Sequence, residues 1–188
     1  MYKKDFPYFT NSNSVYLDSG ATTQKPQSVI DATVEYYTKY CSNTHRSGFG
    51  DAAHATTEFE NTREVLQKFI NANKKEEIIF TKGVTESINF IASSFAYMFK
   101  TVIISSLEHH ANIVPWHMQG RFLNSGLEVV KCNENLDFDF EDFEEILKKN
   151  PNSFVSVAHV TNAFGKVHDI KKIISLAHSY KAPVLIDG

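Results

Sequence analysis

Short apolar runs typical of β-strands alternate with segments of helical periodicity between residues 78 and 186. A short β-branched run predicts a strand, and apolar residues three or four positions apart predict a helix. The predicted strands are residues 78–80, 101–105, 127–131, 154–158 and 183–186, and the predicted helices are residues 84–95, 112–122, 140–148 and 170–179. Because a helix between two strands allows them to run parallel, the pattern predicts an α/β protein with three layers, a mainly parallel sheet with helices on both faces.

The first part of the chain is less regular. Residues 1–15 are polar and aromatic without a period, which predicts an extended N-terminal arm, and residues 16–18 are compatible with a short strand. Pro26 is predicted to open a helix that ends near Tyr40, and a second helix is predicted over residues 53–73. The side chains expected on the inward faces of these helices are Val29, Ile30, Thr33, Val34 and Tyr37 in the first, and Phe59, Val65, Leu66, Phe69 and Ile70 in the second.

Charge and cysteine content argue against several classes of protein. The 188 residues include 19 Lys and Arg against 22 Asp and Glu, a formal net charge of -3, so no global basic field attracts nucleic acid. No apolar run approaches membrane-spanning length, and the start of the chain lacks the apolar core of a signal peptide. Cys41 and Cys132 form no CxxC pair, which is typical of a reducing compartment. We therefore expect a cytoplasmic protein without a nucleic-acid or membrane partner.

Ligands of parallel α/β sheets bind at the carboxyl ends of the strands, so the residues that follow each strand are candidates for a site. Gly83, Val84 and Thr85 follow the first predicted strand and open a helix. The free N–H groups of a helix start, the positive end of its dipole and the hydroxyls of Thr85 and Ser87 suit a phosphate group. A simple helix cap explains the same residues, and the Glu86 carboxylate would repel a phosphate unless it points away.

Three further polar residues follow predicted strands. His109 could be a helix cap, a platform for a flat ring, an acid–base group or a zinc ligand, but its spacing to His117 matches no zinc pattern and we expect no metal. Asn162 can donate to a ring oxygen, although an Asx-turn is the alternative. Asp187 lies at the end of an apolar strand, where a carboxylate needs a cationic partner.

His45 and Arg46 lie in a polar loop, residues 41–52, between two predicted helices. An arginine can pair with a carboxylate, and a neighbouring histidine can bind or relay a proton near neutral pH. A solvated surface pair is the alternative. These two residues are therefore candidates for contact with a substrate.

Together these residues offer a phosphate seat, a stacking ring, a partner for a ring oxygen and an anion for a protonated nitrogen, a set that describes pyridoxal 5′-phosphate. The sequence also resembles the SufS-type cysteine desulfurases, which belong to the class-V aminotransferases and to the fold-type I pyridoxal-phosphate enzymes. The matching segments, in order, are YLDSGATTQKP (16–26), NTHR (43–46), FTKGVTESIN (80–89), EHHANIVPW (108–116), HVTNAFG (159–165) and LIDG (185–188). EHHANIVPW is the most specific of them.

The resemblance implies a role for each candidate. Val84 and Thr85 resemble the phosphate-binding pair, and His109 resembles the imidazole that stacks on the cofactor ring. Asn162 resembles the partner of the ring hydroxyl oxygen, and Asp187 resembles the partner of the ring nitrogen. His109 and Asp187 are thus the implied catalytic residues.

The resemblance also implies substrate-side roles for His45 and Arg46, and it shows two departures. Val84 stands where the family usually has a second threonine, which weakens the expected phosphate contact without removing the backbone N–H. Ser19 and Gly20 stand where the family usually has asparagine and alanine.

In the family, the Schiff-base lysine, the nucleophilic cysteine and a substrate-binding arginine lie downstream of the aspartate. The resemblance therefore implies that residues 16–188 are the N-terminal part of an incomplete pyridoxal-phosphate-binding large domain, inactive alone. The full-length enzyme would convert L-cysteine to L-alanine, pass sulfur as an enzyme-bound persulfide to a sulfur-acceptor protein for iron–sulfur cluster assembly, and form a homodimer. The alternatives are another class-V enzyme, such as a selenocysteine lyase or an aminotransferase, and a non-catalytic truncated binding or assembly module.

Overall fold

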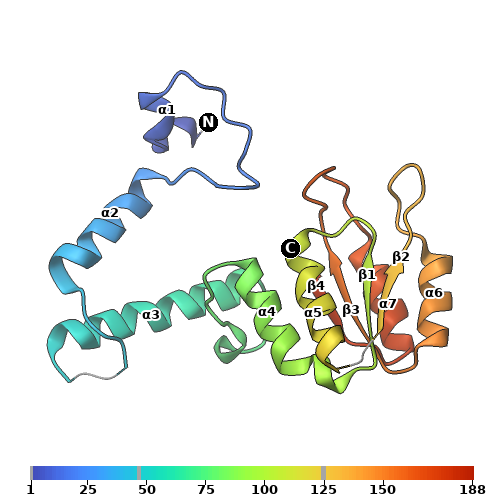
Figure 1. The fold of residues 1–188 in the computed structure, drawn as a ribbon. Coiled ribbons are helices and arrows are strands. Elements are labelled where there is room, and N and C mark those ends of the chain that lie inside the picture. The colour runs from blue at the N-terminus through green and yellow to red at the C-terminus, as the bar shows by residue number, and fades with distance from the viewer. Residues whose placement is uncertain (1, 46–47, 124–125) are drawn as a thin grey trace. The chain divides into compact units, whose positions relative to one another are not determined.

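The computed structural model describes residues 2–45, 48–123 and 126–188 (Figure 1). The chain divides into two compact units, Met1–Phe80 and Thr81–Gly188. The proposed boundary between an arm of residues 1–15 and a domain of residues 16–188 stays a prediction.

A parallel sheet forms the centre of the Thr81–Gly188 unit. Its strands are β1 (Thr101–Ser105), β2 (Gly126–Val130), β3 (Ser153–Ala158) and β4 (Val184–Asp187), in the spatial order β2-β1-β3-β4. All three neighbouring pairs are parallel, and β1 pairs with β3 in the register Ile103↔Val155. These strands agree with the predicted ones to within one residue at either end.

Helices cover both faces of this sheet, as predicted. On one face, α4 (Val84–Phe95) and α5 (Val114–Leu123) enclose a core; on the other, α6 (Phe140–Lys149) and α7 (Ile170–Ser179) enclose a second one. The first core contains Ile88, Ala92, Ala96, Val102, Ile104, Trp116 and Phe154. The second is formed mainly by Ile103, Val130, Phe138, Phe143, Leu147, Val155, Val157 and Ile173. Because successive side chains of β1 enter opposite cores, the three-layer prediction is confirmed.

The strand order reverses in the middle of the sheet. From β1 the chain passes through the short helix η5 (His110–Asn112) and α5 to β2, and α6 then leads back past β1 to β3. In open α/β sheets such a reversal leaves a crevice outside the carboxyl ends of the two strands between which the direction changes. In this sheet the direction changes between β1 and β3, so the rule points to the carboxyl ends of these two strands.

The Met1–Phe80 unit is helical. It contains η1 (Tyr2–Asp5), α1 (Tyr8–Asn11), α2 (Gln27–Glu35), the π-helical turn η2 (Tyr36–Tyr40), α3 (Gly50–Phe69) and η3 (Lys75–Glu77). The helix predicted to end near Tyr40 is thus present, with a π-helical last turn. The extended conformation expected for residues 1–15 is wrong, since two single-turn helices occupy much of that segment.

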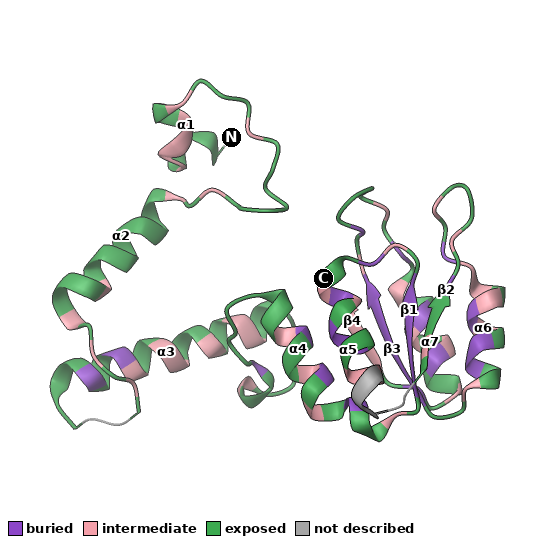
Figure 2. Ribbon diagram, viewed as in Figure 1, coloured by how far each residue is buried: buried purple, intermediate pink, exposed green. Residues whose placement is uncertain are grey.

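Two further expectations for this unit are wrong. The segments 16–18 and 78–80 form no strand, because a strand needs a paired neighbour and neither segment belongs to a β-ladder of the described residues. The predicted inward faces are largely exposed (Figure 2): Val65 is 65% exposed and Phe69 84%, and the described residues of α2 include no buried one. Periodicity predicts a face that can be buried, but not the surface that would cover it.

None of the helices in the described ranges is long and apolar enough to cross a membrane.

Candidate functional site

The candidate site lies at the carboxyl edge of the sheet, within the Thr81–Gly188 unit. The loops after β1 and β3 and the end of β4 all reach this edge (Figure 1). The helix α4 runs opposite to the strands, because it ends at η4 (Ala96–Met98), just before the start of β1. Its N-terminus therefore also lies toward the carboxyl edge, as the phosphate-seat prediction requires.

The start of α4 offers donors to an anion. Gly83 precedes the helix with φ 157° and ψ 175°, a backbone conformation that is essentially restricted to glycine. Its carbonyl accepts the N–H groups of Glu86 and Ser87. The N–H groups of Val84 and Thr85 have no hydrogen-bond partner among the residues that the structure describes, as expected for the first turn of a helix. Both residues are exposed, so an anion can reach these two groups.

Two neighbouring side chains are already engaged. The Ser87 hydroxyl is 2.8 Å from the Thr81 hydroxyl and 3.4 Å from the Gly83 carbonyl oxygen, so it is less available to a phosphate than predicted. The Glu86 carboxylate accepts the Lys82 N–H at 2.6 Å. The Glu86 carboxylate is therefore held by the backbone that precedes the helix, and its negative charge remains near the first turn of α4.

His109 begins η5. Its Nδ1 accepts the Ala111 N–H at 3.1 Å, so the neutral ring carries its proton on Nε2. The ring is exposed and stands nearly perpendicular to that of His110, with 6.2 Å between their centroids. His109 therefore caps this helix through Nδ1, as one of the alternatives predicted. The face of its ring and Nε2 take no part in the cap.

Asp187 ends β4 opposite Ala158 of β3, and its carbonyl oxygen accepts the His159 N–H at 2.7 Å. Loss of solvent raises the pKa of the Asp187 carboxyl group, and an electrostatic contribution from His109 partly offsets this rise. The structure thus places both predicted residues at the carboxyl edge of the sheet. The strand that carries Asp187 is half-buried and not buried as expected, since β4 lies at the edge of the sheet.

Asn162 lies on the loop between β3 and α7. The preceding residue, Thr161, is buried and closes the loop, because its N–H donates to the Lys166 carbonyl at 2.9 Å and its hydroxyl accepts the Lys166 N–H at 3.0 Å. Asn162 itself is exposed, and its side chain makes no hydrogen bond within the described part of the chain. The Asx-turn alternative has no support in these contacts.

A buried polar network behind His109 was missed by the sequence analysis. The Glu108 carboxylate accepts hydrogen bonds from the Ser105 hydroxyl at 2.5 Å, the Asn112 amide at 2.7 Å and the Ala158 N–H at 3.0 Å. The Asn112 amide oxygen in turn accepts from the Trp116 indole at 3.0 Å. Glu108, Asn112 and Trp116 lie four residues apart in EHHANIVPW, so the spacing of polar and aromatic residues was the available signal.

His45 belongs to the Met1–Phe80 unit. It has a left-handed backbone (φ 63°), its N–H donates to the Thr56 hydroxyl at 3.0 Å, and its Nε2 lies 3.1 Å from the Glu60 carboxylate. The hydrogen bond with His45 lowers the pKa of Glu60, with smaller contributions from the positive charges of Arg63 and Lys75. Arg46, the other predicted substrate residue, lies outside the described residues.

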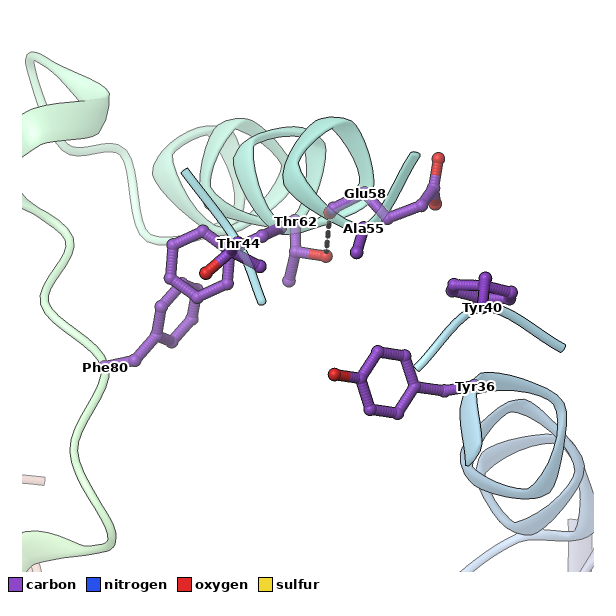
Figure 3. Close-up of a pocket in the computed structure, with 8 residues that line it drawn as sticks. Tyr36, Tyr40, Thr44, Ala55, Glu58, Thr62 and Phe80 are labelled. Carbon is purple, nitrogen blue, oxygen red and sulfur yellow. Dashed lines mark hydrogen bonds between the residues drawn. The ribbon is translucent and has the colours of Figure 1, made fainter. Parts of the chain in front are cut away.

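The same unit contains an aromatic cleft of about 380 Å³ (Figure 3). Tyr36 and Tyr40 face it from one side, and Phe80 lies across it. The other lining residues are Thr44, Ala55, Glu58, Phe59 and Thr62. None of the predicted site residues lines this cleft.

The described residues contain no group of three or more His, Cys, Asp or Glu side chains that could hold a metal ion. Cys41 is exposed and Cys132 half-buried, and both are free thiols.

An open parallel sheet with helices on both faces and a strand-order reversal defines a protein of the doubly wound α/β class. The family model described as "Aminotransferase class-V" matches residues 15–188, and the chain belongs to this family.

Individual proteins are similar over nearly the whole chain. A probable cysteine desulfurase of Vibrio cholerae is 42% identical over 180 residues, which cover 93% of this chain and 44% of that protein. One of Borreliella burgdorferi is 37% identical over 195 residues, 99% of this chain and 46% of that protein. The apo structure of a cysteine desulfurase from Thermococcus onnurineus superimposes with a TM-score of 0.90 at 33% identity, covering 99% of this chain and 46% of that one. The chain thus spans about half the length of the relatives it matches.

Proposed function

We propose that this chain is the N-terminal, cofactor-binding half of a pyridoxal-phosphate-dependent cysteine desulfurase of the SufS type. One observation carries the proposal: His109, which follows β1, and Asp187, which ends β4, lie at the carboxyl edge of a parallel sheet in a class-V aminotransferase chain. The similarity to named cysteine desulfurases supports the choice of reaction.

The residues at this edge fit pyridoxal phosphate. The free N–H groups of Val84 and Thr85, with the Thr85 hydroxyl, are suited to hold the phosphate at the positive end of α4. The His109 ring is available to stack, because its Nδ1 is fixed by Ala111. The Asn162 amide can donate to the ring hydroxyl oxygen, since it has no other described partner.

Asp187 has a distinct task in this proposal. When bound, pyridoxal phosphate acts as an electron sink for reactions of an amino acid. The Asp187 carboxylate would accept a hydrogen bond from the protonated ring nitrogen and hold that proton in place. A cationic partner would also offset the loss of solvent that raises the pKa of Asp187.

The complete protein is proposed to be a cytoplasmic homodimer that acts on L-cysteine and delivers sulfur to an acceptor protein. His45 and Arg46 would contact the substrate, and the covalently cofactor-binding lysine and the nucleophilic cysteine would lie beyond Gly188. That cysteine would take the sulfur as a persulfide while L-alanine leaves.

Assay of the protein expressed from its complete coding sequence tests the proposal. We expect stoichiometric pyridoxal phosphate and equal amounts of alanine and persulfide sulfur from cysteine. Asp187→Ala should lower turnover more than cofactor content, because the ring proton matters most when charge develops in the reaction. Preference for selenocysteine, transamination without sulfur release, or near-normal turnover of Asp187→Ala would contradict it.

A further inference from the structure

The Glu108 carboxylate accepts a strand N–H that would otherwise pair with a backbone carbonyl of a neighbouring strand. The N–H groups of Val155 and His159 donate toward β4, so that of Ala158 points to the opposite side, toward β1. There β1 has already ended, at Ser105. The β1–β3 register stops at Ile104↔Ser156, and Glu108 accepts the Ala158 N–H at 3.0 Å in place of a backbone carbonyl.

This arrangement links the candidate site loops. Glu108 directly precedes His109 in sequence and also bonds to Ser105 at the end of β1. Ala158, its partner on β3, lies opposite Asp187 of β4. One side chain, 9% exposed, therefore connects the backbone next to His109 with the strand ends that hold Asp187.

The donor and acceptor roles in this network are fixed. The Trp116 indole can only donate, and it donates to the Asn112 amide oxygen at 3.0 Å. The Ser156 hydroxyl is 2.5 Å from the same oxygen. The Asn112 NH₂ group must therefore face Glu108, so Asn112 and the Ala158 N–H both donate and the residue at position 108 has to accept from each. The Ser105 hydroxyl donates to the Glu108 carboxylate as well. Asn112 is 0% exposed, so water cannot replace its own hydrogen bonds.

We propose that Glu108 is a positioning residue for the cofactor site: its carboxylate sets the place of His109 relative to the ends of β3 and β4. This inference rests on the proposed pyridoxal-phosphate function. The acceptor pattern, and not the volume of the side chain, is what positions the site.

Glu108→Gln isolates the acceptor pattern, because it keeps the shape of the side chain. Its NH₂ group would face a donor, either the Asn112 amide or the Ala158 N–H. Rotating the Asn112 amide so that its oxygen accepts from the introduced NH₂ group does not help, because the NH₂ group of Asn112 would then face the Trp116 indole N–H.

The double variant Glu108→Gln/Asn112→Asp exchanges acid and amide between the two positions. The carboxylate introduced at position 112 could then accept from Trp116, from Ser156 and from the NH₂ group introduced at position 108. The amide oxygen introduced at position 108 would accept from Ser105 and Ala158, so every donor in the network would again have an acceptor.

Asp142→Asn is the matched control. The Asp142 carboxylate also accepts a backbone N–H just past a strand, that of Lys131 at 2.9 Å after β2, and it bonds to none of the predicted site residues. The change therefore replaces a carboxylate by an amide in the same way, without touching the Glu108 network.

The experiment uses the protein from its complete coding sequence and measures pyridoxal-phosphate affinity, the visible circular dichroism induced in the bound cofactor, and the unfolding temperature. We expect Glu108→Gln to weaken cofactor binding roughly tenfold or more, the equivalent of one unsatisfied buried hydrogen-bonding group, and to reduce the induced dichroism. The double variant should recover both, and Asp142→Asn should change neither.

An unchanged affinity and dichroism in Glu108→Gln would overturn the inference while the proposed function stands. If Glu108→Gln does not fold, the double variant decides: a folded double variant with a native cofactor signal supports the inference, and one without it overturns it. Absence of cofactor binding in the unsubstituted protein would instead overturn the proposed function, and the inference with it.

Discussion

His109 and His110 are neighbours with different surroundings. His109 is the N-cap of η5 and partly offsets the rise that loss of solvent causes in the pKa of the Asp187 carboxyl group, whereas His110 is the first residue of η5. In the complete protein, His109→Ala should shift the absorption band of bound pyridoxal phosphate and strongly lower turnover, since stacking contributes about 0.5–1.5 kcal/mol and acid–base catalysis about 10²- to 10⁴-fold. His110→Ala, the matched control, should leave the band in place. The reverse pattern in absorption spectra and rates would exchange the two roles.

Asp187 should destabilise the chain near neutral pH when no ligand is bound. Its folded-state pKa is raised above the ordinary value of 3.8, so the folded state holds the proton more tightly than the unfolded state does. The resulting loss of stability is complete above the raised pKa and disappears as the pH falls below 3.8. Asp187→Asn should therefore raise the unfolding temperature of this chain near pH 7 and have little effect in acid. A lower unfolding temperature near pH 7 would contradict this.

At this scale, sequence could identify candidate residues but not their contacts. His109 and Asp187 were predicted because polar residues that follow parallel strands share one edge of the sheet. Glu108 was not predicted, because its partner Ala158 lies 50 residues away and donates through the backbone, which carries no sequence signal. For Ser87, sequence showed a hydroxyl at the helix start but not the Thr81 hydroxyl beside it.

At the scale of elements, the turn into α4 depends on Gly83. No atom would lie within 4 Å of an added Cβ, so any effect of Gly83→Ala comes from the backbone at φ 157°. We expect a loss of about 1–3 kcal/mol in the free energy of unfolding, measured by urea denaturation. At Gly126 an added Cβ would make an ordinary contact, 3.5 Å from the Thr101 hydroxyl oxygen, so Gly126→Ala should cost less. Equal losses would show that the backbone at Gly83 is not strained.

The start of α6 gives a second prediction for an element. The Asp139 carboxylate accepts the N–H groups of both Glu141 and Asp142 at 3.0 Å. Asp139→Ala should lower the free energy of unfolding by about 1 kcal/mol, and Asp139→Asn should retain most of it because asparagine is also a good N-cap. Urea denaturation of the three proteins checks this, and an Asn variant as unstable as the Ala variant would refute it.

Elements were predictable where both of their faces are covered. The strands and helices of the Thr81–Gly188 unit agree with the prediction because each apolar run has a core to enter. The segment 78–80 looks like a strand, but no ladder of the described residues includes it. Val65 and Phe69 of α3 have the correct period for burial and are nevertheless exposed.

For the whole molecule, we expect this 188-residue chain to release no sulfide from cysteine and to form no specific lysine adduct with pyridoxal phosphate. The reason is that the resemblance assigns the covalently binding lysine and the nucleophilic cysteine to positions after Gly188. Borohydride reduction followed by mass spectrometry, with a sulfide assay, checks this. A stoichiometric adduct on one lysine together with sulfide release would show that the chain is self-sufficient.

The fixed donor and acceptor roles around Glu108 also constrain how the sequence can diverge. A single exchange of acid for amide at position 108, or of amide for acid at position 112, creates a mismatch inside the protein, whereas both exchanges together restore the pairing. Divergence from the present pair therefore has to cross a less fit intermediate. Among related sequences, positions 108 and 112 should change together or stay as they are. Trp116 should change only where the residue at position 112 has no oxygen that accepts the indole N–H.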